Sequence, residues 1–102
     1  MRDKIHSYLG FAKRSRGLAV GYNSCIYGME RKNVKLLILA KDLSDNSKKK
    51  LSGIAQAQKV PVRVYGVKEL LSDMIGEEDK GVLGITDRNL AKAILNEIDK
   101  EI

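Results

Sequence analysis

The chain has 102 residues, of which 43% are hydrophobic and 31% charged, and it carries a net charge of +6. This balance excludes a disordered chain, and no apolar run approaches the roughly 20 residues that a membrane span needs. Because the N-terminus also lacks the apolar block of a secretory signal, we expect one cytoplasmic domain over residues 1–102 that acts as a monomer.

The first third of the chain predicts a helix, a strand and a second helix. Apolar residues at helical spacing predict a helix over residues 3–15, with Gly17 as its stop. A short apolar strand over residues 18–20 and a loop then lead into a helix over residues 23–32, with Ile26 and Met29 on its inner face. Gly28 inside this helix costs about 1 kcal/mol relative to alanine, so either it permits close packing or the helix is weak.

The middle of the chain predicts a buried strand and a third helix. Residues 34–40 are nearly all apolar, which is typical of a central strand covered on both faces. Ser44 or Asp45 is expected to cap a helix that reaches about residue 58. Lys48 begins a run of three lysines in the first turns of that helix, where the helix dipole disfavours cations. This run indicates either a functional surface or a solvated outer face.

The last part of the chain predicts two more strands and two more helices. Residues 60–65 alternate as a strand does, and Pro61 suits its first residue or an edge position. A helix is expected over residues 67–75, ending at Gly76, followed by a strand over residues 82–86 and a last helix capped by Thr86 or Asp87. Four short strands alternating with five helices predict an α/β domain with one sheet between two helix layers.

The sequence offers little chemistry for an enzyme. It has one cysteine and one histidine, which excludes an internal disulfide and an ordinary zinc site. It has no GxxxxGK[ST] phosphate loop, and its glycines have the wrong spacing for a dinucleotide fingerprint. We therefore expect neither catalysis nor a cofactor nor a metal.

The positive charge and one loop indicate a polyanion partner. Residues 2–35 hold eight basic and two acidic residues, which accounts for the whole net charge of +6. Such a local excess favours a polyanion, although a basic surface for solubility is the alternative. Gly21, Asn23 and Ser24 open the second helix, where free N–H groups can hold a phosphate. Asn23 can read a base edge, or it can simply cap the helix.

Four segments together resemble the kink-turn RNA-binding ribosomal-protein family, in particular its small bacterial YlxQ-type branch. They are LGFAKRSRGLAVG at residues 9–21, KLLILAKDLSDNSKKKL at 35–51, VPVRVYGVKEL at 60–70 and KGVLGITD at 80–87. The resemblance covers nearly the whole chain. It implies a three-layer α-β-α sandwich with a central mixed sheet of about four strands and about five helices, and it implies RNA binding without catalysis.

In that family a G-x-N-E-x-x-K motif at the start of the second helix contacts sheared G·A pairs in sharply bent RNA. Gly21 and Asn23 match the motif, whereas Ser24 stands in place of the glutamate and Tyr27 in place of the lysine. Tyr27 can stack on a base or donate from its hydroxyl. The departures at Ser24 and Tyr27 bear on whether the G·A contacts are kept.

The resemblance extends the candidate RNA-binding surface to further residues. Loops contribute Lys41, Ser44, Lys80 and Gly81, the basic turn after the first helix contributes Lys13, Arg14 and Arg16, and Arg31 and Lys48 complete the set. The positive excess is thereby expected on the RNA-contacting part of the first and second helices. The expected function is binding of structured RNA, a kink-turn or similar bent motif, in association with the ribosome and with rRNA as one target. The alternative is a protein–protein adaptor on the same fold.

Overall fold

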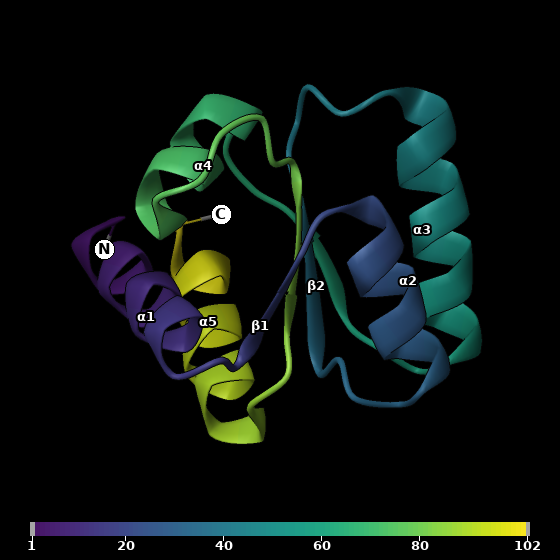
Figure 1. The fold of residues 1–102 in the computed structure, drawn as a ribbon, viewed down its shortest axis with the longest axis horizontal. Helices are drawn as coiled ribbons and strands as arrows, with labels where there is room; N and C mark the ends of the chain where they lie inside the picture. The colour runs from purple at the N-terminus through teal and green to yellow at the C-terminus, as the bar shows by residue number, and fades with distance from the viewer. Residues whose placement is uncertain (1, 102) are drawn as a thin grey trace.

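Five helices and four strands alternate along residues 2–101, the part of the chain that the computed structural model describes (Figure 1). The elements are α1 (Arg2–Arg14), β1 (Leu18–Val20), α2 (Tyr22–Glu30), β2 (Leu36–Leu39), α3 (Asp45–Ala57), β3 (Val62–Val64), α4 (Lys68–Ile75), β4 (Val82–Ile85) and α5 (Arg88–Lys100). Every predicted element is present in the predicted order. Within these residues, no helix combines the length and the apolarity that spanning a membrane requires.

The four strands form one mixed sheet in the order β1-β4-β2-β3. β4 runs antiparallel to both of its neighbours, β1 and β2, whereas β3 pairs parallel to β2. The strands β1, β2 and β3 therefore all begin at one end of the sheet, and β4 begins at the other. The directions of the strands decide which loops and helix ends lie at the same end of the sheet.

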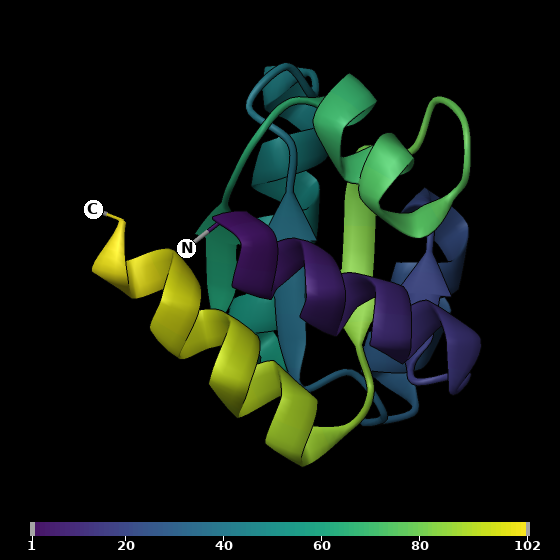
Figure 2. The ribbon, with the colours of Figure 1, turned by 90° about the vertical axis from the view of Figure 1, so that its left-hand side faces the viewer.

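Helices cover both faces of the sheet and confirm the three-layer sandwich. α1, α4 and α5 lie on one face and α2 and α3 on the other (Figure 1), and Figure 2 looks onto the layer that contains α1 and α5. The central strand β2 is fully buried, as predicted. Its alternate residues serve separate cores, Leu36 and Ile38 with the α1, α4 and α5 layer, and Leu37 and Leu39 with the α2 and α3 layer.

Capping side chains resolve two choices that the sequence left open. The hydroxyl of Ser44 accepts a hydrogen bond from the Ser47 N–H (3.2 Å), so Ser44 and not Asp45 caps α3. The carboxylate of Asp87 accepts from the Leu90 N–H (2.9 Å), so Asp87 and not Thr86 caps α5. Short polar side chains at these positions satisfy N–H groups that have no partner within the helix.

The ending of α1 differs from the prediction. Arg16, with φ of 63°, takes the left-handed conformation that usually falls to a glycine. Gly17 instead has its N–H bonded to the Ala12 carbonyl (2.7 Å) and does not adopt a positive φ. The prediction that Gly17 is the stop is therefore wrong by one residue, because the glycine is buried after the turn and an arginine makes the turn.

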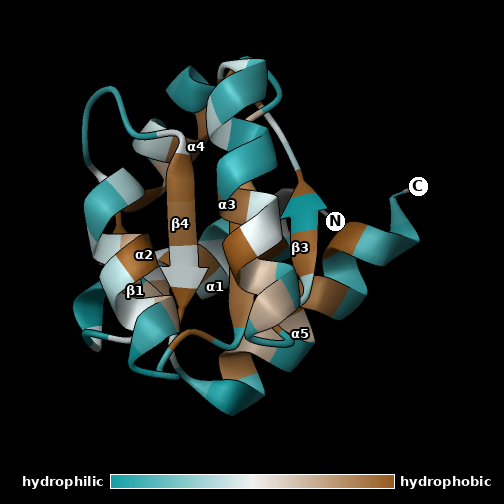
Figure 3. Cartoon of the chain, turned by 90° about the vertical axis from the view of Figure 1, so that its right-hand side faces the viewer, coloured by the Kyte–Doolittle hydropathy of each residue, from teal (hydrophilic) through white to brown (hydrophobic). Residues whose placement is uncertain are grey.

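The structure explains why α2 contains a glycine. A Cβ placed on Gly28 would lie 2.8 Å from Cγ2 of the buried Val34, and Val34 also faces Gly84, where a Cβ would meet it at 3.0 Å. Gly28 therefore permits close packing of α2 on the sheet. Cys25 and Met29 are fully buried on the inner face of α2 while Ile26 is only half-buried, and Figure 3 shows hydrophobic β4 behind the more hydrophilic α2 and α3.

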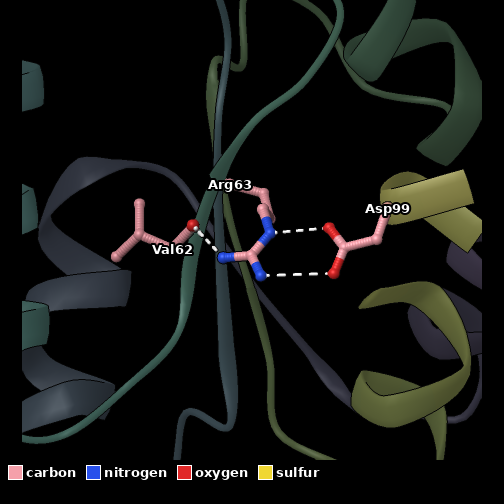
Figure 4. Close-up of polar contacts among 3 residues, drawn as sticks. All are labelled: Val62, Arg63 and Asp99. Atoms are coloured by element: carbon pink, nitrogen blue, oxygen red, sulfur yellow. Dashed lines mark hydrogen bonds and ion pairs between the residues drawn. The ribbon is translucent and has the colours of Figure 1, made fainter. Parts of the chain in front are cut away.

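A paired arginine joins the last helix to the outer strand β3 (Figure 4). Arg63 donates from Nε to Oδ1 of Asp99 (2.8 Å) and from Nη2 to Oδ2 (3.2 Å), and its Nη1 donates to the Val62 carbonyl (2.8 Å). These bonds hold the pKa of Asp99 below its usual range. The C-terminal part of α5 is thus fixed to the sheet by two parallel charged hydrogen bonds.

Candidate functional site

Three connecting segments meet where β1 and β2 end and β4 begins. The N–H of Gly21 donates to the Val82 carbonyl (2.8 Å), and the N–H of Ala40 donates to the Gly81 carbonyl (2.9 Å). Residues 21–24, 41–44 and 80–81 therefore form one surface, which we call the α2 N-terminal end and which lies at the top in Figure 1. The structure thus brings together seven of the predicted site residues: Gly21, Asn23, Ser24, Lys41, Ser44, Lys80 and Gly81.

The first turn of α2 has no side-chain cap. Its N-cap is Gly21, with φ of 98°, and no side chain accepts from the N–H groups that follow. Asn23 is the second residue of the helix, so its interpretation as a cap is wrong. By contrast, one first-turn N–H in each of α3, α4 and α5 donates to a side chain, whereas none does so in α2. N–H groups without a side-chain partner form a ready anion site.

Exposed side chains continue from this turn along the outer face of α2. Asn23 and Ser24 are exposed, and Tyr27, one turn further, is 62% exposed. The guanidinium carbon of Arg31 lies 5.2 Å from the centroid of the Tyr27 ring, a distance at which a cation is attracted to an aromatic face. Because Asn23, Tyr27 and Arg31 are spaced four residues apart, they share one side of the helix.

The loop before β4 is held by a residue that sequence reasoning missed. The hydroxyl of buried Ser72 accepts from the Lys80 N–H (2.8 Å) and donates to the Lys80 carbonyl (3.1 Å). Gly81 is buried, and a Cβ on it would lie 2.9 Å from Cγ of Lys68. Gly81 thus lets the segments approach, while half-buried Lys80 is the residue of this pair that can reach a ligand.

The loop after β2 is anchored on both sides. The N–H of Lys41 donates to the Gly66 carbonyl (2.7 Å), and the carboxylate of Asp42 accepts from the Lys68 N–H (2.9 Å) at the start of α4. Ser44 caps α3, so its hydroxyl oxygen already accepts one hydrogen bond, and Lys48 is half-buried in the first turn of α3. Lys41 is the exposed cation of this loop.

The cations at the end of α1 are not gathered at the α2 N-terminal end. Lys13 donates to a carboxylate oxygen of Glu77 and to the Ile75 carbonyl (3.3 Å), and its bond lowers the pKa of Glu77. Arg14 lies on the α4 side, where it shares a depression with Met74. Lys13 therefore reaches the loop before β4 only as a partner of Glu77.

Arg16 lies at the opposite end of the sheet. The carbonyl of the adjacent Gly17 accepts from the Thr86 N–H (2.9 Å), beyond the last residue of β4. Arg31 also lies away from the first turn, as the C-cap of α2. Six predicted residues thus lie outside the surface formed by the three loops: Lys13, Arg14, Arg16, Tyr27, Arg31 and Lys48.

Acidic residues dominate the flank of the α2 N-terminal end on the α4 side. A depression of about 490 Å³ there is lined by six carboxylates together with Lys68 and Ser72. The carboxylates are those of Asp42, Glu69, Asp73, Glu77, Glu78 and Asp79. The α2 N-terminal end is therefore flanked by negative charge on this side, and the cations that follow α2 lie at its other terminus.

The single cysteine has no role in this surface. Cys25 is fully buried, its thiol donates to the Ala19 carbonyl (3.4 Å), and burial raises its pKa to about 12. A thiol with this pKa is an inert packing group at neutral pH. In residues 2–101, no group of His, Cys, Asp and Glu side chains has an arrangement that could hold a metal ion.

Comparisons with known proteins agree with the fold. The model of the ribosomal protein L7Ae/L30e/S12e/Gadd45 family matches residues 3–95. RNA-binding protein YlxQ of Bacillus subtilis (strain 168) is 30% identical over 91 residues, which are 89% of this chain and 91% of that protein. The Enterococcus faecium protein of the same name is 31% identical over 91 residues, 89% of this chain and 87% of that one.

A solved structure has the same fold. It is that of a protein with unknown function from Bacillus halodurans, which superposes with a TM-score of 0.91 at 31% identity and covers 94% of this chain and 97% of its own. The predicted resemblance is thereby confirmed. The family description and the names of the relatives denote ribosomal and RNA-binding proteins and no enzyme, which confirms the prediction that the chain is not an enzyme.

Proposed function

We propose that this chain, which belongs to the ribosomal protein L7Ae/L30e/S12e/Gadd45 family, binds structured RNA through its α2 N-terminal end. The observation that carries the proposal is the uncapped first turn of α2 beside exposed Asn23 and Ser24. The two YlxQ relatives are named RNA-binding proteins, which supports RNA as the polyanion. A helix start without a side-chain cap keeps its N–H donors free for a phosphate.

The proposed RNA is sharply bent, a kink-turn or a similar motif. A regular A-form helix hides its base edges in a narrow major groove, whereas an irregular bend displays them. The phosphate at the bend would meet the first N–H groups of α2, and the amide of Asn23 would read a base edge. Lys41 and Lys80, whose backbones are fixed by hydrogen bonds, would neutralise flanking phosphates.

Two residues of the proposed site differ in what they can add. Ser24 has no charge, so its side chain can offer the RNA only a hydroxyl, which donates or accepts a hydrogen bond. Tyr27 is exposed and can stack on an unpaired base, with Arg31 already over its ring. We further propose ribosomal RNA as a target and a cytoplasmic monomer as the active form.

The test compares a kink-turn hairpin with a straight duplex of equal length in gel-shift titrations. The parent protein should prefer the kink-turn, and Asn23→Ala should reduce that preference roughly 5- to 150-fold, the value of a good base contact. Asn89→Ala is the matched control, because Asn89 is also exposed and is the second residue of α5. An unchanged preference in Asn23→Ala removes Asn23 as a reader of bases.

The second candidate is a protein–protein adaptor on the same fold. The acidic depression beside the α2 N-terminal end favours it, because six carboxylates suit a basic protein partner better than RNA. The same titration separates the two candidates. If the parent binds neither RNA at low salt, RNA binding is refuted and the adaptor remains.

A further inference from the structure

Three consecutive helices end in a basic residue with left-handed backbone. Arg16 after α1, Lys32 after α2 and Lys59 after α3 have φ of 63°, 61° and 60°. Glycine adopts this conformation without strain and is its usual occupant, as at Gly76 after α4. The chain therefore accepts backbone strain to place a cation at each of three helix ends.

The topology brings these helix ends together. β1, β2 and β3 start at the same end of the sheet, so the helices that precede them finish there, as does β4 before α5. We call this surface the α2 C-terminal end, at the bottom in Figure 1. Its cations are Arg16, Lys32, Lys35, Lys59 and Arg88.

Four of these cations line one depression. It has a volume of about 340 Å³, and its lining consists of Lys32, Lys35, Lys59 and Arg88 with Val34, Gln58 and Val60. None of these described lining residues is acidic. Lys35 is held in place, because its Nζ donates to the Lys32 carbonyl (3.1 Å).

The acidic residues nearby do not balance this charge. Asp87, which caps α5, and Glu30, exposed in the last turn of α2, supply two negative charges against the five cations, so a positive excess remains. Favourable dipoles at helix C-termini account for part of the pattern, since they attract Lys32 and Lys59. They do not account for Arg88, which begins α5, where the dipole disfavours a cation.

We infer that the α2 C-terminal end is a second RNA-contacting surface, which takes the sugar–phosphate backbone of a stem extending from the proposed bend. The inference rests on the proposed function and extends it to the opposite end of the sheet. A chain of phosphates fits better than a single small anion, because the cations are spread over an open surface. RNA fits better than an acidic protein because the exposed face of α2 joins the two ends.

The joining face is short enough for one RNA to cover. Asn23, Tyr27 and Arg31 follow each other along it, and the nine residues of α2 span roughly 13 Å at 1.5 Å per residue. An RNA bent at Asn23 can therefore pass Tyr27 and reach Lys32 without leaving the protein surface.

The test uses Lys32→Gln/Lys59→Gln and its matched control Lys49→Gln/Lys50→Gln, which removes the same charge from the exposed face of α3. Each protein is titrated at 50 and 200 mM salt against three RNAs. The first is a kink-turn hairpin with short stems, and each of the others has one stem lengthened by about ten base pairs. Unfolding midpoints verify that both variants are folded.

When one of the stems is lengthened, the affinity of the parent protein should depend more steeply on salt. The control variant should show the same increase in the salt slope. Lys32→Gln/Lys59→Gln should lose it, because two lost phosphate contacts lower the slope of log K against log salt by about 1.8. Its loss of affinity between 50 and 200 mM salt then becomes about 12-fold smaller on the long RNA.

The failures of the two proposals are distinguishable. If the parent binds none of the three RNAs, the proposed function fails and this inference fails with it. If the parent binds the short RNA but the double variant keeps the full salt slope on the long ones, only the second surface is refuted. An equal loss on short and long RNAs also refutes it, because it would reflect net charge and not a local contact.

Discussion

The packing of α2 against Val34 can be tested by mutagenesis. The test asks why a helix that carries the proposed site contains a glycine. Gly28→Ala adds a Cβ at 2.8 Å from Cγ2 of Val34, whereas Gly53→Ala adds one on exposed α3 with nothing within 4 Å. Both changes replace a helical glycine with alanine. They differ only in what the new methyl group meets.

The expected effects have opposite signs. Gly53→Ala should stabilise the domain by about 1 kcal/mol through helix propensity, which raises the Tm by roughly 4–8 °C at this size. Gly28→Ala gains the same propensity but overpacks a buried β-branched side chain, at a cost of roughly 1–3 kcal/mol. Its net effect should be a loss of about 1 kcal/mol, because Val34 is buried and also packs against Gly84.

The assay is urea denaturation of both variants, of Val34→Ala and of the Gly28→Ala/Val34→Ala double variant. Removing the methyl groups of Val34 leaves room for the added Cβ, so the double variant should be more stable than additivity predicts, by roughly 1 kcal/mol. If Gly28→Ala stabilises as much as Gly53→Ala, or the double variant is additive, the clash is not what requires the glycine.

Three further predictions concern buried or paired groups. Ser72→Ala should cost about 1–3 kcal/mol in urea denaturation and speed amide exchange at Lys80, because it leaves the Lys80 N–H without its partner. Arg63→Gln should lower the Tm at neutral pH. The bond to Arg63 depresses the pKa of Asp99 in the folded state. The stabilisation of the folded state by this bond is therefore fully present above the ordinary aspartate pKa of about 3.9, and it is lost as the pH falls through the lower pKa that Asp99 has in the folded state. The Tm difference from the parent should therefore shrink in acid, and a difference that stays constant would contradict this. Cys25, buried with its pKa raised to about 12, should resist iodoacetamide at pH 8 until the protein is unfolded.

Local patterns predicted the elements because each depends on near neighbours in the chain. Apolar spacing identified the helices, and Ser44 and Asp87 lie three residues before the N–H groups that they cap. The bond from the Lys68 N–H to Asp42 joins residues 26 apart, and Ser72 meets Lys80 eight residues on. Such contacts depend on how whole elements pack, so the sequence carried no signal for them.

The sequence predicted which residues form the candidate site, but it did not predict how the charged residues are distributed around that site. Gly21, Asn23 and Lys80 lie together as the resemblance implied. The sequence could not show that Arg16 lies at the opposite end, because that depends on the direction of the strands. Part of the cation excess in the first third of the chain therefore lies at the far end of the sheet from the site.

The link between Arg63 and Asp99 also bears on how copies of this chain behave when concentrated. The Pro61 carbonyl and the Tyr65 N–H bond to β2, so the backbone groups of Val62 and Val64 face away from the sheet. One of these outward groups, the Val62 carbonyl, is already occupied by the guanidinium. A strand from another molecule would have to displace Arg63 from both Val62 and Asp99 before it could pair there, which guards the sheet against edge-to-edge aggregation.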